Sequence, residues 1–365
     1  MKDKLGNYIS EYSVRNKEDR NIPVYSVTNS NGFCTEYFGK EVASKDKKTY
    51  KMVPRNYFAY NPSRINVGSI DCQTKEDVVI VSPLYVVFSV DDRIDNRYLY
   101  YYLKSNVANF YIRAKATGSV RDNLKYSMLE EFPIRIRSLE EQKRIAKKLD
   151  LLNGLIEDYR KSLVLYEDLI KSRFVEMFSS SSERKSLEEY SSLITKGASP
   201  KWQGVDYCDE GTLFITSENV REGYVDLSKR KYLPNEINTI LPRSVLQRND
   251  VLINIVGASI GRAAIFNTDE LANINQAVAL VRIKNNAINL TYLVAFLNSS
   301  EAQKAYSFMK KGGARDNLSL KNISDLKIPV ASLSKQEEFA SFVAQVDKSK
   351  LVYVMYFRWE ILTLF

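Results

Sequence analysis

Apolar residues in the middle of the chain recur at alternating spacings of four and three, which is the seam pattern of a heptad helix. Ser138 and Glu141 have the spacing of a capping box, so we predict a helix from Leu139 to Phe178, before the serine-rich stretch 179–182. At about 1.5 Å per residue it spans about 60 Å. An amphipathic helix on a single core is the alternative, but that length exceeds a domain's width. The seam consists of Ile145, Leu149, Leu152, Ile156, Tyr159, Leu163, Tyr166 and Ile170.

The segments on either side of this helix combine strand and helix patterns. Short apolar runs predict strands, and amphipathic runs predict short helices. Both halves therefore belong to the mixed α/β class. The predicted strands are 78–81, 84–90 (set off by Pro83), 250–256 and 277–283, and the predicted helices are 97–105 and 291–298.

The two halves are copies of one plan. Arg121-Asp-Asn-Leu124 recurs as Arg315-Asp-Asn-Leu318 at an offset of 194, and the same offset carries Gln142 onto Gln336. The match runs without a gap from about residue 94 to 142. Farther upstream, the offset between matching residues becomes 193, which indicates a small insertion. Toward the start of each copy, only isolated hints of a match remain. Such a long register indicates an internal repeat.

The repeat supplies a second long helix, whose seam residues are Phe339, Val343 and Val346. We predict two similar globular α/β domains joined by two long antiparallel coiled-coil helices, with the copies related by a pseudo-twofold axis. The expected segments are a first globular domain at 1–138, the central helix and linker at 139–182, a second globular domain at 183–332 and a C-terminal helix at 333–365.

The tail departs from the pattern. After Lys350, 12 of the last 15 residues are apolar or aromatic, and the charged faces of the first helix disappear. One explanation is a short buried helix packed between the long helix and a partner. The other is a truncated or frame-altered C-terminus, which would weaken the helix pairing.

The excess of positive charge is confined to the globular parts. Lys and Arg number 53 against 44 Asp and Glu, for a net charge of +9. Residues 1–138 hold 22 basic and 16 acidic residues (+6), residues 183–332 hold 19 and 16 (+3), and the remaining segments are neutral. These two parts are the candidate polyanion-binding surfaces, although a modest positive balance also serves plain solubility.

The chain has no histidine, which excludes histidine-based nucleophile systems and histidine-ligated metals. Any catalysis must therefore rest on carboxylate, lysine, tyrosine or cysteine side chains. Its three cysteines, Cys34, Cys72 and Cys208, are too few and too far apart for a disulfide framework or a Cys-x-x-Cys site. No apolar stretch is long enough to span a membrane. We expect a cytoplasmic protein with no metal site. The stretch from Gly257 to Gly261 is predicted to be a tight turn between strands, because it lacks the rest of a dinucleotide-binding motif.

Several of these segments together resemble the specificity subunit of type I restriction-modification enzymes. The resemblance covers about residues 1–350. It rests on Asn61-Pro-Ser-Arg-Ile-Asn-Val-Gly68, Val81-Ser-Pro-Leu-Tyr-Val-Val87, the paired Arg-Asp-Asn-Leu runs, Ser138-Leu-Glu-Glu-Gln-Lys-Arg-Ile145 with its helix, Asn249-Asp-Val-Leu-Ile-Asn-Ile-Val-Gly257 and Asn275-Gln-Ala277.

The resemblance implies a non-catalytic, sequence-specific DNA-binding subunit. The globular domains 1–138 and 183–332 would be the first and second target recognition domains, each of which binds one half of a bipartite site in double-stranded DNA. The helices would set the spacing. The implied protein partners are two modification (methyltransferase) subunits, docked on the helices, and restriction (endonuclease/translocase) subunits. S-adenosylmethionine, ATP and Mg would be needed on those partners only. The alternative is a truncated or silent copy that acts as a weak DNA-binding adaptor. A stand-alone DNA-modifying enzyme is disfavoured, because no methyltransferase motif is present.

Candidate DNA contacts are basic, amide and aromatic residues in stretches that look like loops. Each has a structural alternative: Arg121 and Arg315 pair with the neighbouring aspartates or serve folding, the lysine pair is a solvated charge run, and Trp202 is the edge of a core. Residues that discriminate bases should differ between the copies if the half-sites differ. The candidates are Arg64, Lys115, Ser119 and Arg121 in the first domain, and Lys201, Trp202, Gln203, Arg262, Lys310, Lys311 and Arg315 in the second.

Overall fold

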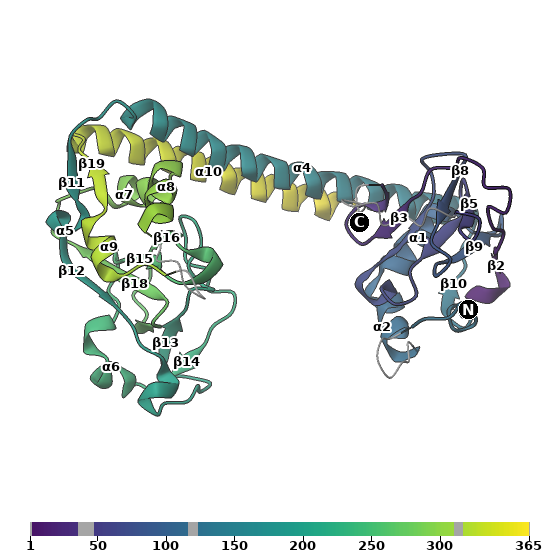
Figure 1. Ribbon diagram of the computed structural model, residues 1–365, viewed down its shortest axis with the longest axis horizontal. Helices are drawn as coiled ribbons and strands as arrows, with labels where there is room; N and C mark the ends of the chain where they lie inside the picture. Colours follow the sequence, from purple (N-terminus) through teal and green to yellow (C-terminus); the bar gives the residue numbers. More distant parts are fainter. Residues whose placement is uncertain (1, 36–46, 116–122, 310–316, 365) are drawn as a thin grey trace. The chain divides into compact units, whose positions relative to one another are not determined.

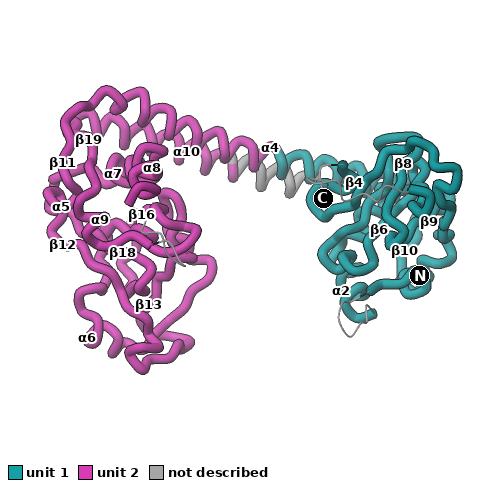
Figure 2. Tube along the Cα trace, in the orientation of Figure 1, with its two compact units in different colours: residues 1–157, 364 teal, residues 158–363, 365 magenta. Residues whose placement is uncertain are grey.

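The computed structural model describes residues 2–35, 47–115, 123–309 and 317–364, without the side chains of Lys2, Tyr353 and residues 355–364. Apart from the last two residues, the chain divides into two compact units, 1–157 and 158–363 (Figure 2). The division falls inside the long helix α4 (Leu139–Phe178), which has the bounds expected from the heptad pattern (Figure 1).

The first unit is built on a four-stranded antiparallel sheet with the strand order β2-β9-β6-β7. Phe58 on β6 pairs with Phe88 on β9, and their rings stack 5.2 Å apart in the core. Around this sheet, the described residues of the unit form small strand pairs, the short α-helices α1–α3 and two 3-10 helices. The elements are β1 (Lys2–Lys4), η1 (Leu5–Asn7), β2 (Ile9–Glu11), β3 (Ser26–Thr28), β4 (Gly32–Cys34), β5 (Lys51–Pro54), β6 (Phe58–Tyr60), η2 (Ile65–Val67), β7 (Ile70–Cys72), β8 (Val78–Val81), β9 (Val86–Val90), α1 (Asn96–Lys104), α2 (Asn106–Lys115), α3 (Tyr126–Leu129) and β10 (Pro133–Arg135).

The second unit has the corresponding sheet, β12-β18-β15-β16, and adds a three-stranded sheet, β14-β13-β17. Its elements are β11 (Arg184–Ser186), α5 (Leu187–Tyr190), β12 (Ser191–Lys196), η3 (Pro200–Gln203), β13 (Thr212–Ile215), β14 (Tyr232–Leu233), α6 (Ile237–Ile240), η4 (Pro242–Ser244), β15 (Val251–Asn254), η5 (Gly257–Ser259), β16 (Ala263–Ile265), β17 (Ala272–Ile274), β18 (Val278–Ile283), α7 (Leu290–Leu297), α8 (Ser300–Met309), α9 (Leu320–Asp325), β19 (Lys327–Pro329) and α10 (Leu333–Leu364). The predicted strands and short helices are therefore present, with shifts of a few residues at their ends.

The internal repeat is visible in individual hydrogen bonds. Tyr98 donates from its hydroxyl to the Arg135 carbonyl at 2.8 Å, and its counterpart Tyr292 donates to the Pro329 carbonyl at 2.7 Å. Both partners are shifted by 194 residues. The faint upstream match is real as well, because Leu5 and its counterpart Leu187 are each fully buried. The two units thus share one plan, as the sequence predicted.

A buried glutamine ties each long helix to its globular part. Gln142 accepts a hydrogen bond from the Asp95 N–H at 2.8 Å and donates to the carbonyls of Arg93 and Arg137 at 3.0 and 2.9 Å. Gln336 on α10 accepts from the Asn289 N–H at 2.8 Å and donates to the carbonyl of Ala331 at 2.8 Å. Asp95 and Asn289 are the N-caps of α1 and α7, so the same joint is built in both units.

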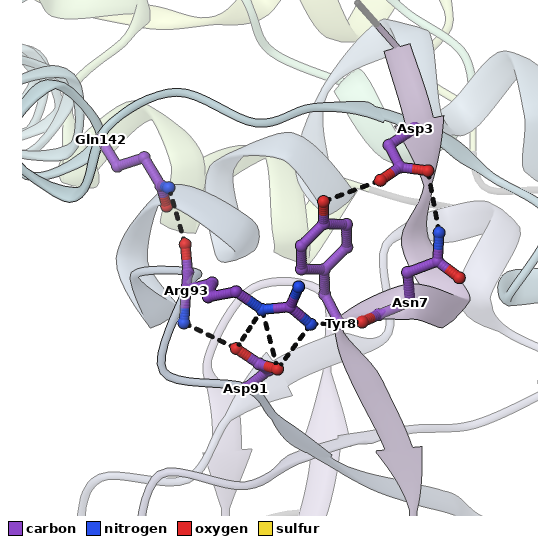
Figure 3. Close-up of polar contacts among 6 residues, drawn as sticks. All are labelled: Asp3, Asn7, Tyr8, Asp91, Arg93 and Gln142. Atoms are coloured by element: carbon purple, nitrogen blue, oxygen red, sulfur yellow. Dashed lines mark hydrogen bonds and ion pairs between the residues drawn. The ribbon is translucent and has the colours of Figure 1, made fainter.

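The joint in the first unit continues into a polar network near the N-terminus (Figure 3). Arg93 forms an ion pair with Asp91 at 2.8 Å and lies over the Tyr8 ring, 4.6 Å from its centroid. The Tyr8 hydroxyl in turn donates to Asp3 at 2.8 Å. Hydrogen bonds from Arg93 hold the pKa of Asp91 well below its usual range, and the bond from Tyr8 lowers the pKa of Asp3.

Within the second unit, the last turns of α4 lie beside the first turns of α10, and the two helices run antiparallel (Figure 2). Phe174 contacts Phe339 with ring centroids 5.5 Å apart, and Arg173 forms an ion pair with Glu338 at 3.1 Å. Phe178 and Tyr292 complete a buried aromatic cluster. This cluster joins both long helices to α7.

The predicted seam residues lie on the less exposed side of their helices. Phe339 and Val346 are buried, and Val343 and the eight seam residues of α4 are half-buried. Ile170 and Val343 pack against the cluster that contains Phe339. For the rest of the seam, pairing stays a prediction. Among the described residues, no helix combines the length and apolar character needed to cross a bilayer.

A buried ion pair secures the central sheet of the second unit. Arg282 on β18 donates to both carboxylate oxygens of Asp250 at 2.8 Å, and Asp250 also accepts from the Gln247 N–H at 2.7 Å. The Asp250 side chain is only 1% exposed. These bonds raise the pKa of Arg282.

We expect Asp250→Ala to lower the free energy of unfolding by about 3–5 kcal/mol, because it leaves the guanidinium partly buried without its carboxylate. Urea denaturation of the full chain measures this change. Asp269→Ala is the matched control, since it removes an exposed partner of Arg248 and should cost less than about 1 kcal/mol. Equal losses in the two variants would contradict the role of the buried pair.

The network around Arg93 predicts a pH dependence. A carboxylate with a lowered pKa stabilises the fold above its unfolded pKa of about 3.9, and this contribution is lost as the pH falls toward the folded value. The melting temperature of Asp91→Asn should therefore lie below that of the wild type by a constant amount above about pH 5, and the difference should shrink below about pH 4. Asp77→Asn removes the same charge from a fully exposed side chain and is the control. A difference that is unchanged down to pH 3 would count against the network.

Candidate nucleic-acid interface

An open cavity of about 910 Å³ lies in the first unit. Its walls come from segments far apart in the sequence: strand β3, the loop 61–69, the turn 84–86 and residues 123–126. Most of the side chains that line it are polar or charged. They include Glu11, Thr28, Asn29, Asn61, Ser63, Arg64, Asn123 and Lys125.

The loop that carries Arg64 is closed by its own hydrogen bonds. The Arg64 N–H donates to the Asn61 carbonyl at 3.0 Å, and the Arg64 carbonyl accepts from Val67 and Ser69 at 3.2 Å each. The backbone turns at Gly68, where φ is +89° and a Cβ would lie 2.2 Å from the side-chain oxygen of Asn29. Glycine is therefore required here.

Asp71 and Lys104, which carry opposite charges, hold parts of this cavity wall through hydrogen bonds to the backbone. Asp71 accepts hydrogen bonds from the Phe33 and Cys72 N–H groups at 2.9 and 2.8 Å, and the Lys104 ammonium donates to the Gly68 carbonyl. Burial raises the pKa of Asp71 and lowers the pKa of Lys104, while the charge of each opposes the shift of the other. Together they hold the β3–β4 hairpin and the loop 61–69 in place.

The end of the repeated Arg-Asp-Asn-Leu run is docked in the same way in both units. The Leu124 N–H donates to the Pro62 carbonyl at 3.2 Å, and the Leu318 N–H donates to the Ile255 carbonyl at 2.9 Å. Both leucines are buried. In the first unit this brings Asn123 and Lys125 to the cavity that Arg64 lines. Ser119 and Arg121 lie outside the described residues.

The placement of Lys115 in a loop is wrong. It is the last residue of helix α2 and is half-buried. The helix continues this far because Ala108 and Ile112, one turn apart, bury the same face. Lys115 does not line the cavity, whereas Arg64 is exposed on its wall.

In the second unit, Lys201, Trp202 and Gln203 are exposed on the short 3-10 helix η3. Buried Pro200 fixes its start, and Gly204 ends it in the left-handed conformation. The Trp202 side chain is 82% exposed, so it is not the edge of a core. An exposed indole beside a lysine provides a flat apolar face and a positive charge.

Arg262 follows the turn 257–261 between β15 and β16 and is half-buried. The predicted turn is thus present. Asn254, which precedes it, is fully buried and donates to the carbonyls of Ser217 and Val220 at 3.0 and 3.3 Å. Lys310, Lys311 and Arg315 lie outside the described residues.

The prediction from sequence missed several residues of the cavity, among them Glu11, Asn29, Asn123 and Lys125. Asn123 belongs to the repeated run, which was the available signal for it. Glu11 and Asn29 reach the cavity only through the folding of the chain, and no local pattern marks them. Within the described part of the chain, no group of three or more histidine, cysteine or acidic side chains has an arrangement that could hold a metal ion.

Comparison with known proteins gives consistent matches over both halves. The model of the type I restriction modification DNA specificity domain matches residues 4–163 and 183–352. The type I restriction enzyme EcoBI specificity subunit of Escherichia coli is 25% identical over 346 residues, which cover 84% of this chain and 72% of that protein.

Two solved structures share the fold. A chain from a study of complex assembly and conformational transition of the type I R-M system aligns over 100% of this chain and 94% of its own length, with a TM-score of 0.59 and 16% identity. The type I restriction-modification S subunit from M. genitalium aligns over 100% and 92%, with a TM-score of 0.53 and 16% identity. Because the family model matches both copies of the repeat, the chain belongs to the type I restriction modification DNA specificity family.

Proposed function

We propose that this chain is the DNA-specificity subunit of a type I restriction-modification complex. The first target recognition domain, 1–138, binds one half of a bipartite site in double-stranded DNA, and the second, 183–332, binds the other half. One observation carries the proposal. The two units share the same four-stranded sheet and the same glutamine joint to a long helix, yet they have different side chains at equivalent positions of their loops. Arg64 in the first unit, for example, corresponds to Gly257 in the second.

The long helices are proposed to set the spacing of the half-sites and to dock two modification subunits. Exposed apolar side chains on α4 support docking, because such side chains are costly to leave in water and mark contact surfaces when they cluster. Val164, Leu165 and Leu169 are 56%, 68% and 47% exposed and lie within two turns. Restriction subunits complete the complex.

Catalysis is assigned to the partners. Methyl transfer from S-adenosylmethionine belongs to the modification subunits, and ATP- and Mg-dependent cleavage belongs to the restriction subunits. The absence of histidine from the sequence supports a role in DNA recognition rather than chemistry. No observation on the described residues favours the alternative of a truncated or silent adaptor.

Cells that express this chain with its modification subunit should acquire methylated adenine in a bipartite motif. Single-molecule sequencing of their genomic DNA measures this directly. A chain in which residues 1–138 are replaced by the first domain of another family member should change one half of the motif and leave the other half and the gap unchanged. Recovery of an intact complex without any methylated motif would contradict the proposal.

Trp202 is expected to contact DNA. The sequence has two tryptophans, so Trp359→Phe leaves Trp202 as the sole indole. Its fluorescence should be quenched when target duplex is added. Trp202→Ala should weaken binding on the order of tenfold, because truncation of a tryptophan at an interface removes its contact area and costs more than about 1 kcal/mol. Trp202→Phe keeps a ring and should lose less. Unchanged emission in a complex that has formed would show that Trp202 lies away from the DNA.

A further inference from the structure

The cavity of the first unit has a chemistry that goes beyond general DNA affinity. We propose that it is the place where this unit contacts base edges of its half-site, and that Arg64 is a residue that selects the base. This inference rests on the proposed function as a DNA-specificity subunit. It assigns the double-stranded DNA ligand to one cavity and distinguishes base contact from phosphate contact.

The charges of the walls favour bases over phosphates. Arg64 and Lys125 are positive, but Glu11 also lines the cavity. A carboxylate repels the phosphate backbone, so a surface that only follows phosphates has no use for one. Base edges present both signs of hydrogen-bonding group: arginine donates to guanine O6 and N7, and a carboxylate accepts from the amino group of cytosine. A wall with both charges therefore suits base edges.

The apolar residues that line the cavity also favour base edges over phosphates. Leu84 and Val67 both line it, and their side chains are 79% and 58% exposed. Exposed leucine and valine gain little from a phosphate. The C5-methyl group of thymine, which lies in the major groove, is an apolar partner for such side chains.

The cavity is also preformed. The backbone hydrogen bonds of Arg64, the turn at Gly68 and the support from Lys104 hold the loop before any ligand arrives. Binding then orders only side chains, which lowers its entropic cost and gives each base contact a defined direction.

The second unit lacks this set of side chains at the equivalent places. Gly257 replaces Arg64, and Ala277 replaces Leu84. Asn254 replaces Asn61, and its amide is consumed by backbone carbonyls in the core. Asn61 and Asn123 have asparagine counterparts in the second unit, whereas Arg64 and Leu84 are particular to the first unit. Residues that select the bases of only one half-site are expected to differ between the units in this way.

The test is a selection of bound duplexes from a pool with randomised positions, using the full chain assembled with its modification subunit. The wild type should enrich a bipartite motif. Arg64→Ala should lose preference at one or two positions of a single half-site, with the other half-site and the gap unchanged. Affinity for the wild-type site should fall by about 10- to 100-fold, the range for one lost bidentate contact.

Two further variants sharpen the result. Arg64→Lys keeps the charge but not the fork of donors, so it should retain general affinity and still lose the base preference; it also covers the case in which Arg64→Ala does not fold. Arg20→Ala removes the same charge at an exposed residue that pairs with Glu18 and does not line the cavity, and its motif should equal that of the wild type.

Contrary outcomes are distinguishable. If Arg64→Ala weakens binding to all sequences equally and reduces the salt dependence by about one ion, Arg64 contacts a phosphate and the inference is wrong while the proposed function stands. The same holds if Arg64→Lys has the wild-type motif. A wild-type chain that enriches no bipartite motif overturns the proposed function, and this inference with it.

Discussion

The joint made by a buried glutamine at the start of each long helix is the constraint on which the rest of the structure depends. In the first unit, Gln142 satisfies the N–H of the α1 N-cap and two carbonyls at once, and Gln336 repeats this joint with one carbonyl in the second. No apolar residue of similar size replaces these bonds, because buried backbone groups would be left without partners. The amide therefore fixes where each helix leaves its globular part and in which direction it starts.

Both units share the glutamine joint and the four-stranded sheet, so their loops can differ without a change of fold. The turns at Gly68 and Gly261 have the same backbone conformation, with φ of +89° and +88°, yet the residues before them differ in charge and size. Arg64 can be substituted without loss of the loop's backbone hydrogen bonds, because it joins them only through its own N–H and carbonyl groups. In this arrangement, the exposed residues of the loops can differ between the units while the sheet and the long helices are kept. One repeated plan can therefore carry two different sets of loop side chains.

The repeat, the long helix and the central strands were predictable because they depend on local periodicity and on matches between distant copies. The helix bounds at Leu139 and Phe178 follow from a cap and a serine-rich stretch that are both local signals. The cavity was not predictable. Arg64 was marked by its loop composition, but Glu11 and Asn29 join it through strand pairings that no short pattern encodes. Lys115 was misplaced because two buried residues one turn apart outweigh a polar stretch nearby.

The absence of histidine also gains a physical meaning. Of the side chains with ordinary pKa values, only histidine changes its charge between pH 5 and 8. Cysteine adds nothing at Cys72, where burial raises the thiol pKa to about 12. The positive charge that this chain offers to DNA is therefore nearly constant across that range. In the cavity lined by Arg64, Lys125 and Glu11, recognition therefore depends on the base sequence and on the ionic strength.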